Sequence, residues 1–194
     1  GDDENRRLLE GMMAEAGIDY SGLIKSDKRS TITKMRILGA KQQMLRLDFE
    51  EVGDLFEDET ERLSEWLGGW LLNLIDSGLD GIAVSDYAKG VCSHNFLQWV
   101  IKTAAEHKVP VLVDPKGADW TKYSGCDFIT PNLKEMCEAA HETVPNEDEP
   151  VLRLARAAAT QYNIKNVVVT RSEKGMTLAG QSGLIINALA TSLD

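Results

Sequence analysis

The first part of the chain carries two stretches with the apolar spacing of amphipathic helices. Apolar residues recur on one face over residues 4–16, and a second, longer stripe runs over residues 58–76. A spacing of three to four residues is that of a helix with one buried side. We therefore expect two helices here, and we place Trp66 and Trp70, which lie on the second stripe, in the core.

Between these two helices the pattern changes to a period of two. Residues 31–38 and 43–50 have the composition of strands, and in the second run apolar and polar residues alternate from one face to the other. Residues 39–42 form the short connection between the runs and begin with a glycine. The pattern predicts a β-hairpin.

From residue 81 onward, short apolar runs alternate with helical patterns. Uninterrupted apolar runs are typical of strands that are buried on both faces of a parallel sheet, and the alternation of strand and helix is typical of a three-layer α/β fold. We predict a mostly parallel central sheet that follows the N-terminal β-hairpin. The expected strands are 81–85, 109–113, 127–130, 166–170, 176–180 and 184–189, and the expected helices are 93–107, one that begins near residue 132, and 149–162.

Composition and charge limit the classes of partner. We expect one domain over residues 1–194, and a formal charge of -10 argues against binding nucleic acid or an anionic membrane through a general basic surface. The three cysteines form neither a CxxC pair nor a zinc-binding spacing, which fits free thiols in the cytoplasm. No apolar run approaches the roughly 20 residues of a membrane span.

Four successive strands of the predicted sheet end in polar residues. In an open parallel sheet, ligands bind at the carboxyl ends of the strands, and these ends meet at one edge. We therefore expect side chains from all four strand ends to lie close together. These residues are Asp86, Tyr87 and Lys89, then Asp114 and Lys116, then Asn132 and Glu135, and finally Thr170, Arg171 and Gly175.

This edge combines cations with carboxylates in an acidic protein. Lysine is a flexible point charge for phosphate, and Mg²⁺ is held by one or two carboxylates together with waters and phosphate oxygens. Glycines such as Gly117 and Gly175 allow the backbone to approach a ligand closely. The pattern predicts a site for a phosphorylated substrate and a magnesium-nucleotide, the reactants of phosphoryl transfer.

Each of these residues also has a purely structural interpretation. The sequence Asp-Pro-Lys-Gly at 114–117 is also that of an ordinary β-turn. Asn132 has the character of a helix N-cap with Glu135 as its capping-box partner. Taken alone, Lys89 is better explained as a solvated lysine, and Tyr87 can be explained as a packing residue. The functional interpretation depends on the coincidence of polar residues at four successive strand ends.

Several short motifs, in order along the chain, carry a resemblance to a known family. The Asn-x-x-Glu sequence at 132–135 resembles the motif of the ribokinase-like (PfkB) sugar kinases, and "VTRSEKGM" at 169–176 resembles the strand and turn that line ATP in that family. The sequences "TITKMRIL", "QQMLRLDFEE", "SDYAKG", "DPKG" and "TPNLKE" together look like the kinase domain of the heptose-7-phosphate kinases, which is often fused to an adenylyltransferase. The likeness covers essentially the whole chain.

The resemblance implies an ATP- and Mg²⁺-dependent kinase that phosphorylates D-glycero-D-manno-heptose 7-phosphate at its 1-position, for ADP-heptose and lipopolysaccharide core synthesis, and that forms a homodimer. It assigns the sugar phosphate or the transferring phosphoryl group to Arg36, Asp86, Tyr87, Lys89 and Lys116. It assigns ATP to Asn132, Glu135, Thr170, Arg171 and Gly175, with Glu135 also at the metal.

Two motifs of the family are missing from the sequence. The family carries a Gly-Gly…Asn sugar-binding segment, which we expect before Gly1, and a Gly-Ala-Gly-Asp motif, which we expect just after Asp194. The aspartate of the second motif is the catalytic base. We therefore expect a kinase domain truncated at both ends, we name no catalytic base, and we expect this segment by itself to be inactive.

The sequence is also compatible with two other functions. One is a kinase of the same superfamily that acts on another sugar or on a nucleoside, and the other is a non-catalytic module that binds a nucleotide or a sugar phosphate. A dinucleotide-dependent oxidoreductase is disfavoured, because no G-x-G-x-x-G follows an early strand.

Overall fold

The computed structural model describes residues 1–40, 42–181, 183 and 185–188. The chain forms two compact units, Gly1–Leu72 and Asn73–Asp194, and we describe each by itself. Lys41 in the expected turn, and Leu184 and Leu189 at the two ends of the last expected strand, lie outside the described residues.

The first unit contains the two expected helices and the expected hairpin. Helix α1 begins after Asp3, whose side chain accepts a hydrogen bond from the backbone N–H of Arg6 at 2.9 Å and so caps the helix. Strands β1 and β2 are antiparallel, with a register shift between Ile37 and Leu38. The elements are α1 (Glu4–Glu15), β1 (Thr33–Gly39), β2 (Gln42–Phe49) and α2 (Glu57–Asp76), whose last residues belong to the second unit.

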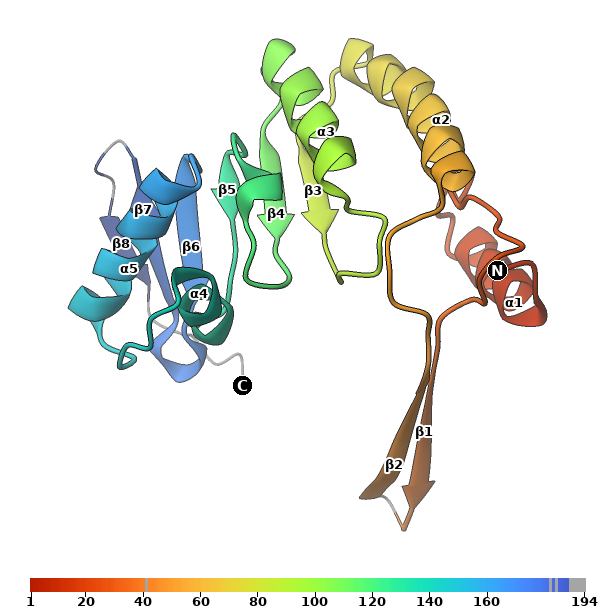
Figure 1. Cartoon of the computed structure of the whole chain (residues 1–194), viewed down its shortest axis with the longest axis horizontal. Helices are drawn as coiled ribbons and strands as arrows, with labels where there is room; N and C mark the ends of the chain where they lie inside the picture. The colour runs from red at the N-terminus through yellow and green to blue at the C-terminus, as the bar shows by residue number, and fades with distance from the viewer. Residues whose placement is uncertain (41, 182, 184, 189–194) are drawn as a thin grey trace. The chain divides into compact units, whose positions relative to one another are not determined.

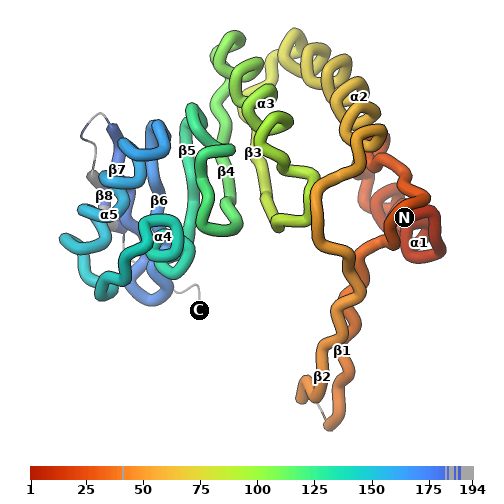
Figure 2. Tube along the Cα trace, in the orientation of Figure 1, coloured from red at the N-terminus to blue at the C-terminus, as the bar shows by residue number. Residues whose placement is uncertain are grey.

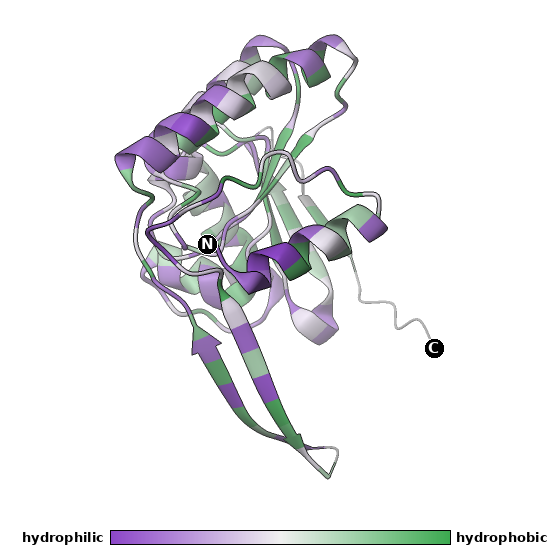
Figure 3. Ribbon diagram, turned by 90° about the vertical axis from the view of Figure 1, so that its right-hand side faces the viewer, coloured by the Kyte–Doolittle hydropathy of each residue, from purple (hydrophilic) through white to green (hydrophobic). Residues whose placement is uncertain are grey.

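The hairpin is amphipathic. Polar and apolar residues alternate along both strands (Figure 3). The register pairs Met35 with Leu47 and Ile37 with Leu45, so these side chains share one face. Met35, Ile37 and Leu45 are between 42% and 49% exposed, so this apolar face is open.

The two tryptophans of α2 do not lie in the core, contrary to expectation. Their rings stack on each other with centroids 5.0 Å apart, and Trp70 is 38% exposed. The helical spacing correctly identified one face of α2, but spacing alone does not show what that face packs against.

The second unit is built on a six-stranded sheet with the order β3-β4-β5-β6-β7-β8 (Figure 1). Strands β3 to β6 are parallel, and β6, β7 and β8 are antiparallel to one another in turn. The predicted order of strands and helices is confirmed. The elements are β3 (Ile82–Ser85), α3 (His94–Glu106), β4 (Val111–Asp114), η1 (Thr121–Tyr123), β5 (Phe128–Ile129), α4 (Leu133–Ala140), α5 (Asp148–Gln161), β6 (Asn166–Thr170), η2 (Ser172–Lys174), β7 (Met176–Gly180) and β8 (Ile185–Ala188).

Helices α3, α4 and α5 lie on one face of this sheet (Figure 1). The side chains under them are fully buried, as are Val113, Ile129 and Val167, which come from three adjacent strands. The other face is more open, since Leu112, the neighbour of Val113 on β4, is 41% exposed. We expected the strands to be buried on both faces. In β4 the face that carries Val113 is buried, but the face that carries Leu112 is partly exposed, so the expectation is wrong for that second face.

Candidate functional site

The carboxyl ends of β3, β4, β5 and β6 lie at one edge of the sheet, as predicted. The chain leaves each of these strands at the same edge (Figure 2), because the four strands are parallel and adjacent. We call this edge, with the residues that follow the four strands, the strand-end rim. It brings Asp86, Lys116, Glu135 and Thr170 to neighbouring positions.

Asp86, which follows β3, is the most deeply buried acid of the rim, at 4% exposure. Its Oδ2 atom accepts hydrogen bonds from Lys122 Nζ at 2.5 Å and from Tyr123 Oη at 2.7 Å. Its Oδ1 atom accepts one from the backbone N–H of Ala88 at 2.7 Å. A buried carboxylate needs such partners, because an unpaired charge away from water is costly.

Burial and these contacts determine the protonation states of Asp86, Tyr123 and Cys92. Burial alone would raise the pKa of Asp86, but the hydrogen bonds from Lys122, Tyr123 and Ala88 together lower it below 3.8, so the group is a carboxylate at neutral pH. Burial raises the pKa of Tyr123 far above its ordinary value, and the bond to Asp86 adds to this effect. Burial also raises the pKa of the Cys92 thiol, to about 11. Tyr123 therefore keeps its proton, and Cys92 remains a thiol.

The loop after β3 is held in an unusual backbone conformation. Ala88 has a φ of 52°, a left-handed value that is uncommon for residues other than glycine. Its N–H bond to Asp86 supports this turn. The turn leaves Tyr87 69% exposed, whereas Lys89 is half-buried. Asp86 is thus a structural anchor of this loop, and Tyr87 is its exposed part.

Lys116, which follows β4, reaches across to α4. Its Nζ atom lies 2.9 Å from Glu135 Oε1, and the Lys116 side chain is 51% exposed while that of Glu135 is 12% exposed. The hydrogen bond to Glu135 raises the pKa of Lys116, and the charge of Glu135 adds to the effect. The rim therefore holds an exposed ammonium group and a largely covered carboxylate in direct contact.

Asn132 and Glu135 form a complete capping box at the start of α4. Asn132 Oδ1 accepts from the N–H of Glu135 at 2.9 Å, and Glu135 Oε2 accepts from the N–H of Asn132 at 3.1 Å. The structural interpretation of these residues is thereby confirmed. Glu135 Oε1 is engaged by Lys116 instead, so the two oxygens of this carboxylate have different partners.

Thr170 joins the last of the four strand ends to the third. It forms an isolated parallel bridge with Asn132, and its N–H donates to Pro131 O at 2.8 Å. Gly175, with a φ of 77°, closes the tight turn that follows, and its carbonyl accepts from the N–H of Arg171 at 2.8 Å. The backbone of this turn lies at the rim.

The side chain of Arg171 is buried, and its Nε and Nη1 atoms are bonded within the fold, while Nη2 has no hydrogen-bond partner among the described residues. Its guanidinium donates to Asn146 Oδ1 at 2.9 Å, to Asp148 Oδ1 at 2.6 Å and to Thr177 Oγ1 at 2.9 Å. These contacts tie the start of α5 to β7. The side chain thus has a structural role, and a nucleotide contact by the backbone at this position stays a prediction.

Arg36 belongs to β1 of the first unit, where it is exposed and faces Arg46 across the hairpin. All the other predicted site residues belong to the second unit. The role assigned to Arg36 therefore remains a prediction from the resemblance.

Two residues of the rim, Lys122 and Tyr123, were missed by the sequence analysis. They lie in the short helix η1 after β4, and not at a strand end. Neither residue belongs to a motif that the sequence analysis singled out. The only available signal was the buried strand that ends in Ser85-Asp86, because a buried acid needs a cationic partner.

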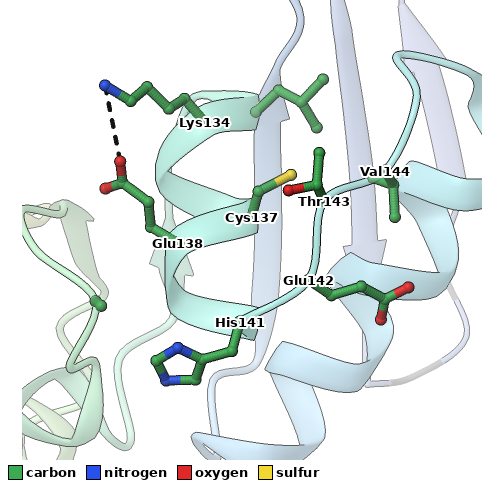
Figure 4. Close-up of a pocket in the computed structure, with 9 residues that line it drawn as sticks. Lys134, Cys137, Glu138, His141, Glu142, Thr143 and Val144 are labelled. Carbon is green, nitrogen blue, oxygen red and sulfur yellow. Dashed lines mark ion pairs between the residues drawn. The ribbon is translucent and has the colours of Figure 1, made fainter.

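The described residues also form a pocket of about 890 Å³ beside α4 (Figure 4). Its wall includes Leu133, Cys137 and Val144, and the Lys134–Glu138 ion pair, with 3.7 Å between Nζ and Oε1, lies on the exposed side of the helix. None of the predicted site residues lines this pocket. We therefore place the functional site at the strand-end rim.

The residues of the rim fit a magnesium-nucleotide. Within the part of the chain that the structure describes, no group of three or more His, Cys, Asp and Glu side chains is arranged to hold a metal ion. Mg²⁺ does not require such a group, since it takes one or two carboxylates and completes its shell with waters and phosphate oxygens. Glu135 supplies a carboxylate whose Oε1 atom already has a cation, Lys116, as its partner.

The sequence profile of the pfkB family carbohydrate kinases matches residues 1–192. The chain belongs to this family. The prediction of the family from the short motifs is confirmed.

Two relatives match nearly the whole chain. The bifunctional protein HldE of Geobacter sulfurreducens is 35% identical over 187 residues, which are 96% of this chain and 37% of that protein. HldE of Methylobacillus flagellatus is 38% identical over 183 residues, which are 94% of this chain and 36% of that protein. The chain thus spans little more than a third of the length of these relatives.

Solved structures confirm the fold. Ribokinase from Giardia lamblia matches with a TM-score of 0.73 at 15% identity, over 100% of this chain and 58% of that one. Phosphofructokinase-2 from Escherichia coli matches with a TM-score of 0.71 at 16% identity, over 99% of this chain and 60% of that one. The predicted ribokinase-like fold is correct. In the described part of the chain, no helix is long and apolar enough to cross a membrane.

Proposed function

We propose that the protein to which this chain belongs is a cytoplasmic, ATP-dependent kinase that phosphorylates D-glycero-D-manno-heptose 7-phosphate at its 1-position, as a step toward ADP-heptose. The observation that carries the proposal is the contact of Lys116 with Glu135 at the strand-end rim, in a chain of the PfkB family. An ammonium group beside a carboxylate suits a phosphoryl group and its Mg²⁺ ion.

In this proposal the rim residues have different roles. Lys116 neutralises phosphate charge, and Glu135 holds Mg²⁺ through water or directly. Asn132, Thr170 and the backbone near Gly175 line the nucleotide. The loop after β3, with Tyr87 and Lys89, faces the sugar phosphate. The role of Arg36 at the substrate rests on the family resemblance alone.

The function is tested with the natural protein that contains this chain. Release of ADP from ATP is measured with heptose 7-phosphate and with a panel of other sugars, sugar phosphates and nucleosides, and the product is identified by phosphorus NMR. We expect the highest kcat/KM with heptose 7-phosphate and a phosphate at position 1. A higher value with another acceptor would make the protein a different kinase of the family, and ATP binding without transfer to any acceptor would make it a binding module.

The role of Glu135 is tested by Glu135→Gln. The amide keeps the size of the side chain and an oxygen that can accept from the Asn132 N–H, but it removes the negative charge that attracts Mg²⁺. We expect the Mg²⁺ concentration that gives half-maximal activity to rise by about tenfold or more. The control is Glu138→Gln, one turn further along α4 and half exposed. Equal Mg²⁺ dependence in the two variants would contradict the assignment.

We also propose that the protein is a homodimer that uses the apolar face of the hairpin. Ile37→Ser removes an apolar side chain that is 42% exposed in the single chain. If a partner covers it, the dimer dissociation constant should rise by about tenfold or more. Arg46→Ser, on the opposite face of the same hairpin, is the control. Sedimentation equilibrium measures both, and a monomeric wild-type protein would refute the proposal.

A further inference from the structure

The residues of the rim are connected by a continuous path of hydrogen bonds. Asp86 after β3 is bonded to Tyr123 of η1, and Tyr123 is bonded to the backbone of Lys116 after β4. The side chain of Lys116 then reaches Glu135 of α4, whose other oxygen accepts from the Asn132 N–H after β5. The described residues thus link three strand ends, and Tyr123 lies at the junction of the first two.

The hydroxyl of Tyr123 uses both its donor and its acceptor capacity. It donates to Asp86 Oδ2 at 2.7 Å, and it accepts from the N–H of Lys116 at 3.1 Å. The Tyr123 side chain is fully buried, so neither partner is easily replaced by water. The high pKa caused by burial keeps the proton on the hydroxyl throughout the working pH range.

We propose that Tyr123 is a positioning residue for phosphoryl transfer: its hydroxyl fixes the backbone of Lys116 against the Asp86 anchor and thereby places the ammonium group of Lys116 at the rim. The proposal rests on the proposed function, because it supposes that Lys116 acts on a phosphate. Tyr123 itself touches no substrate in this scheme and acts through Lys116.

The surroundings of Lys116 explain why its backbone needs the hydrogen bond to Tyr123. Its side chain is long and 51% exposed, and the next residue, Gly117, has a φ of 84°, a conformation that glycine adopts without strain. Pro115, just before it, has no N–H to bond. The Tyr123 hydroxyl therefore provides the bond to the backbone N–H of this turn that keeps the start of the lysine side chain in place. A displacement of about 1 Å at a phosphate-binding group is enough to slow catalysis strongly.

The test is Tyr123→Phe in the natural protein, which removes the hydroxyl and keeps the ring. Tyr162→Phe is a matched control, because Tyr162 is also a buried tyrosine that donates one hydrogen bond, to Ala139 O of α4 at 2.9 Å, and not to Lys116 or Asp86. The substitution keeps the ring, which packs against Trp120 with centroids 5.7 Å apart. Both variants lose a buried hydrogen bond, so both should lower the melting temperature. We expect kcat to fall about tenfold or more in Tyr123→Phe alone, with the KM for ATP changed by less than about threefold.

A double variant shows whether Tyr123 acts through Lys116. In a Lys116→Ala background, Tyr123→Phe should change kcat by less than about twofold, since the group that it positions is already gone. Losses that multiply would overturn the inference, as would equal kinetic losses in Tyr123→Phe and Tyr162→Phe.

Hydrogen exchange gives a readout that does not depend on the reaction. The amide of Lys116 should exchange faster in Tyr123→Phe than in the wild-type protein, and at the wild-type rate in Tyr162→Phe. An unchanged rate in Tyr123→Phe would overturn the inference even if the protein is the proposed kinase. A wild-type protein that does not phosphorylate heptose 7-phosphate would overturn the proposed function, and the exchange rates would still decide whether Tyr123 holds Lys116.

Discussion

Lys116→Ala should reduce kcat/KM by an amount equivalent to about 2–4 kcal/mol of transition-state stabilisation. Lys116 is an exposed cation of the rim and is in direct contact with Glu135. An ammonium group that faces a transferring phosphoryl group compensates charge that spreads over the phosphate oxygens. The measurement is the steady-state rate of ADP release by the natural protein at saturating ATP and varied sugar phosphate.

Lys134→Ala is the control for this variant. Lys134 lies on α4 near Glu135, is 85% exposed, and pairs with Glu138 at 3.7 Å. The substitution Lys134→Ala removes the same charge from the same region and leaves the rim residues unchanged. It should leave kcat/KM within about twofold of the wild-type value. If Lys116→Ala retains near-wild-type turnover, Lys116 does not act on the phosphoryl group.

Asp86→Ala should lower the free energy of unfolding by about 3 kcal/mol. The substitution removes a carboxylate with three hydrogen-bond donors and leaves Lys122, whose side chain is 19% exposed, without its acid. It also removes the acceptor of the Ala88 N–H, whose hydrogen bond supports the left-handed turn. The measurement is urea-induced unfolding of the natural protein, with Glu142→Ala as the control. Glu142 pairs with Arg153 at the surface, where solvent screens the pair, so its loss should cost far less stability than the loss of Asp86.

The stabilisation by Asp86 should depend on pH in one direction. Its pKa in the folded protein lies below the ordinary 3.8, so the folded state binds the proton more weakly than the unfolded state does. The contribution is therefore complete well above 3.8 and is lost as the pH falls through the lower, folded value. The difference in stability between wild type and Asp86→Ala should be constant above about pH 5 and should shrink below about pH 4. A difference that grows on acidification would contradict the ion pair.

The sequence was sufficient to predict the order of elements and the position of the rim. Uninterrupted apolar runs such as Val111-Leu112-Val113 indicate strands, and parallel strands bring their carboxyl ends to one edge. The location of Asp86, Lys116 and Glu135 followed from that rule. The capping box at Asn132 followed from local sequence, because its two hydrogen bonds span only three residues.

The partners of these residues could not be predicted in the same way. Lys122 and Asp86 are 36 residues apart, and their contact depends on how η1 is placed beside the loop that follows β3. Arg171 looked like a nucleotide-binding residue, yet its side chain is buried with Asp148 and Thr177. Burial of a cation is decided by distant acceptors, which no local pattern records. The same limit applies to Trp70, whose exposure depends on what the rest of the chain places beside α2.

On the proposed function, the contact between Lys116 and Glu135 has a consequence for how ligands would bind at the rim. In this structure the ammonium group of Lys116 is already the counterion of the carboxylate that we propose for Mg²⁺. A nucleotide with its metal would bring a cation for Glu135 and an anion for Lys116, so both residues would gain a new counterion together. Free Mg²⁺ or free nucleotide would supply only one of the two. The pair would therefore favour the complex of metal and nucleotide over either component by itself.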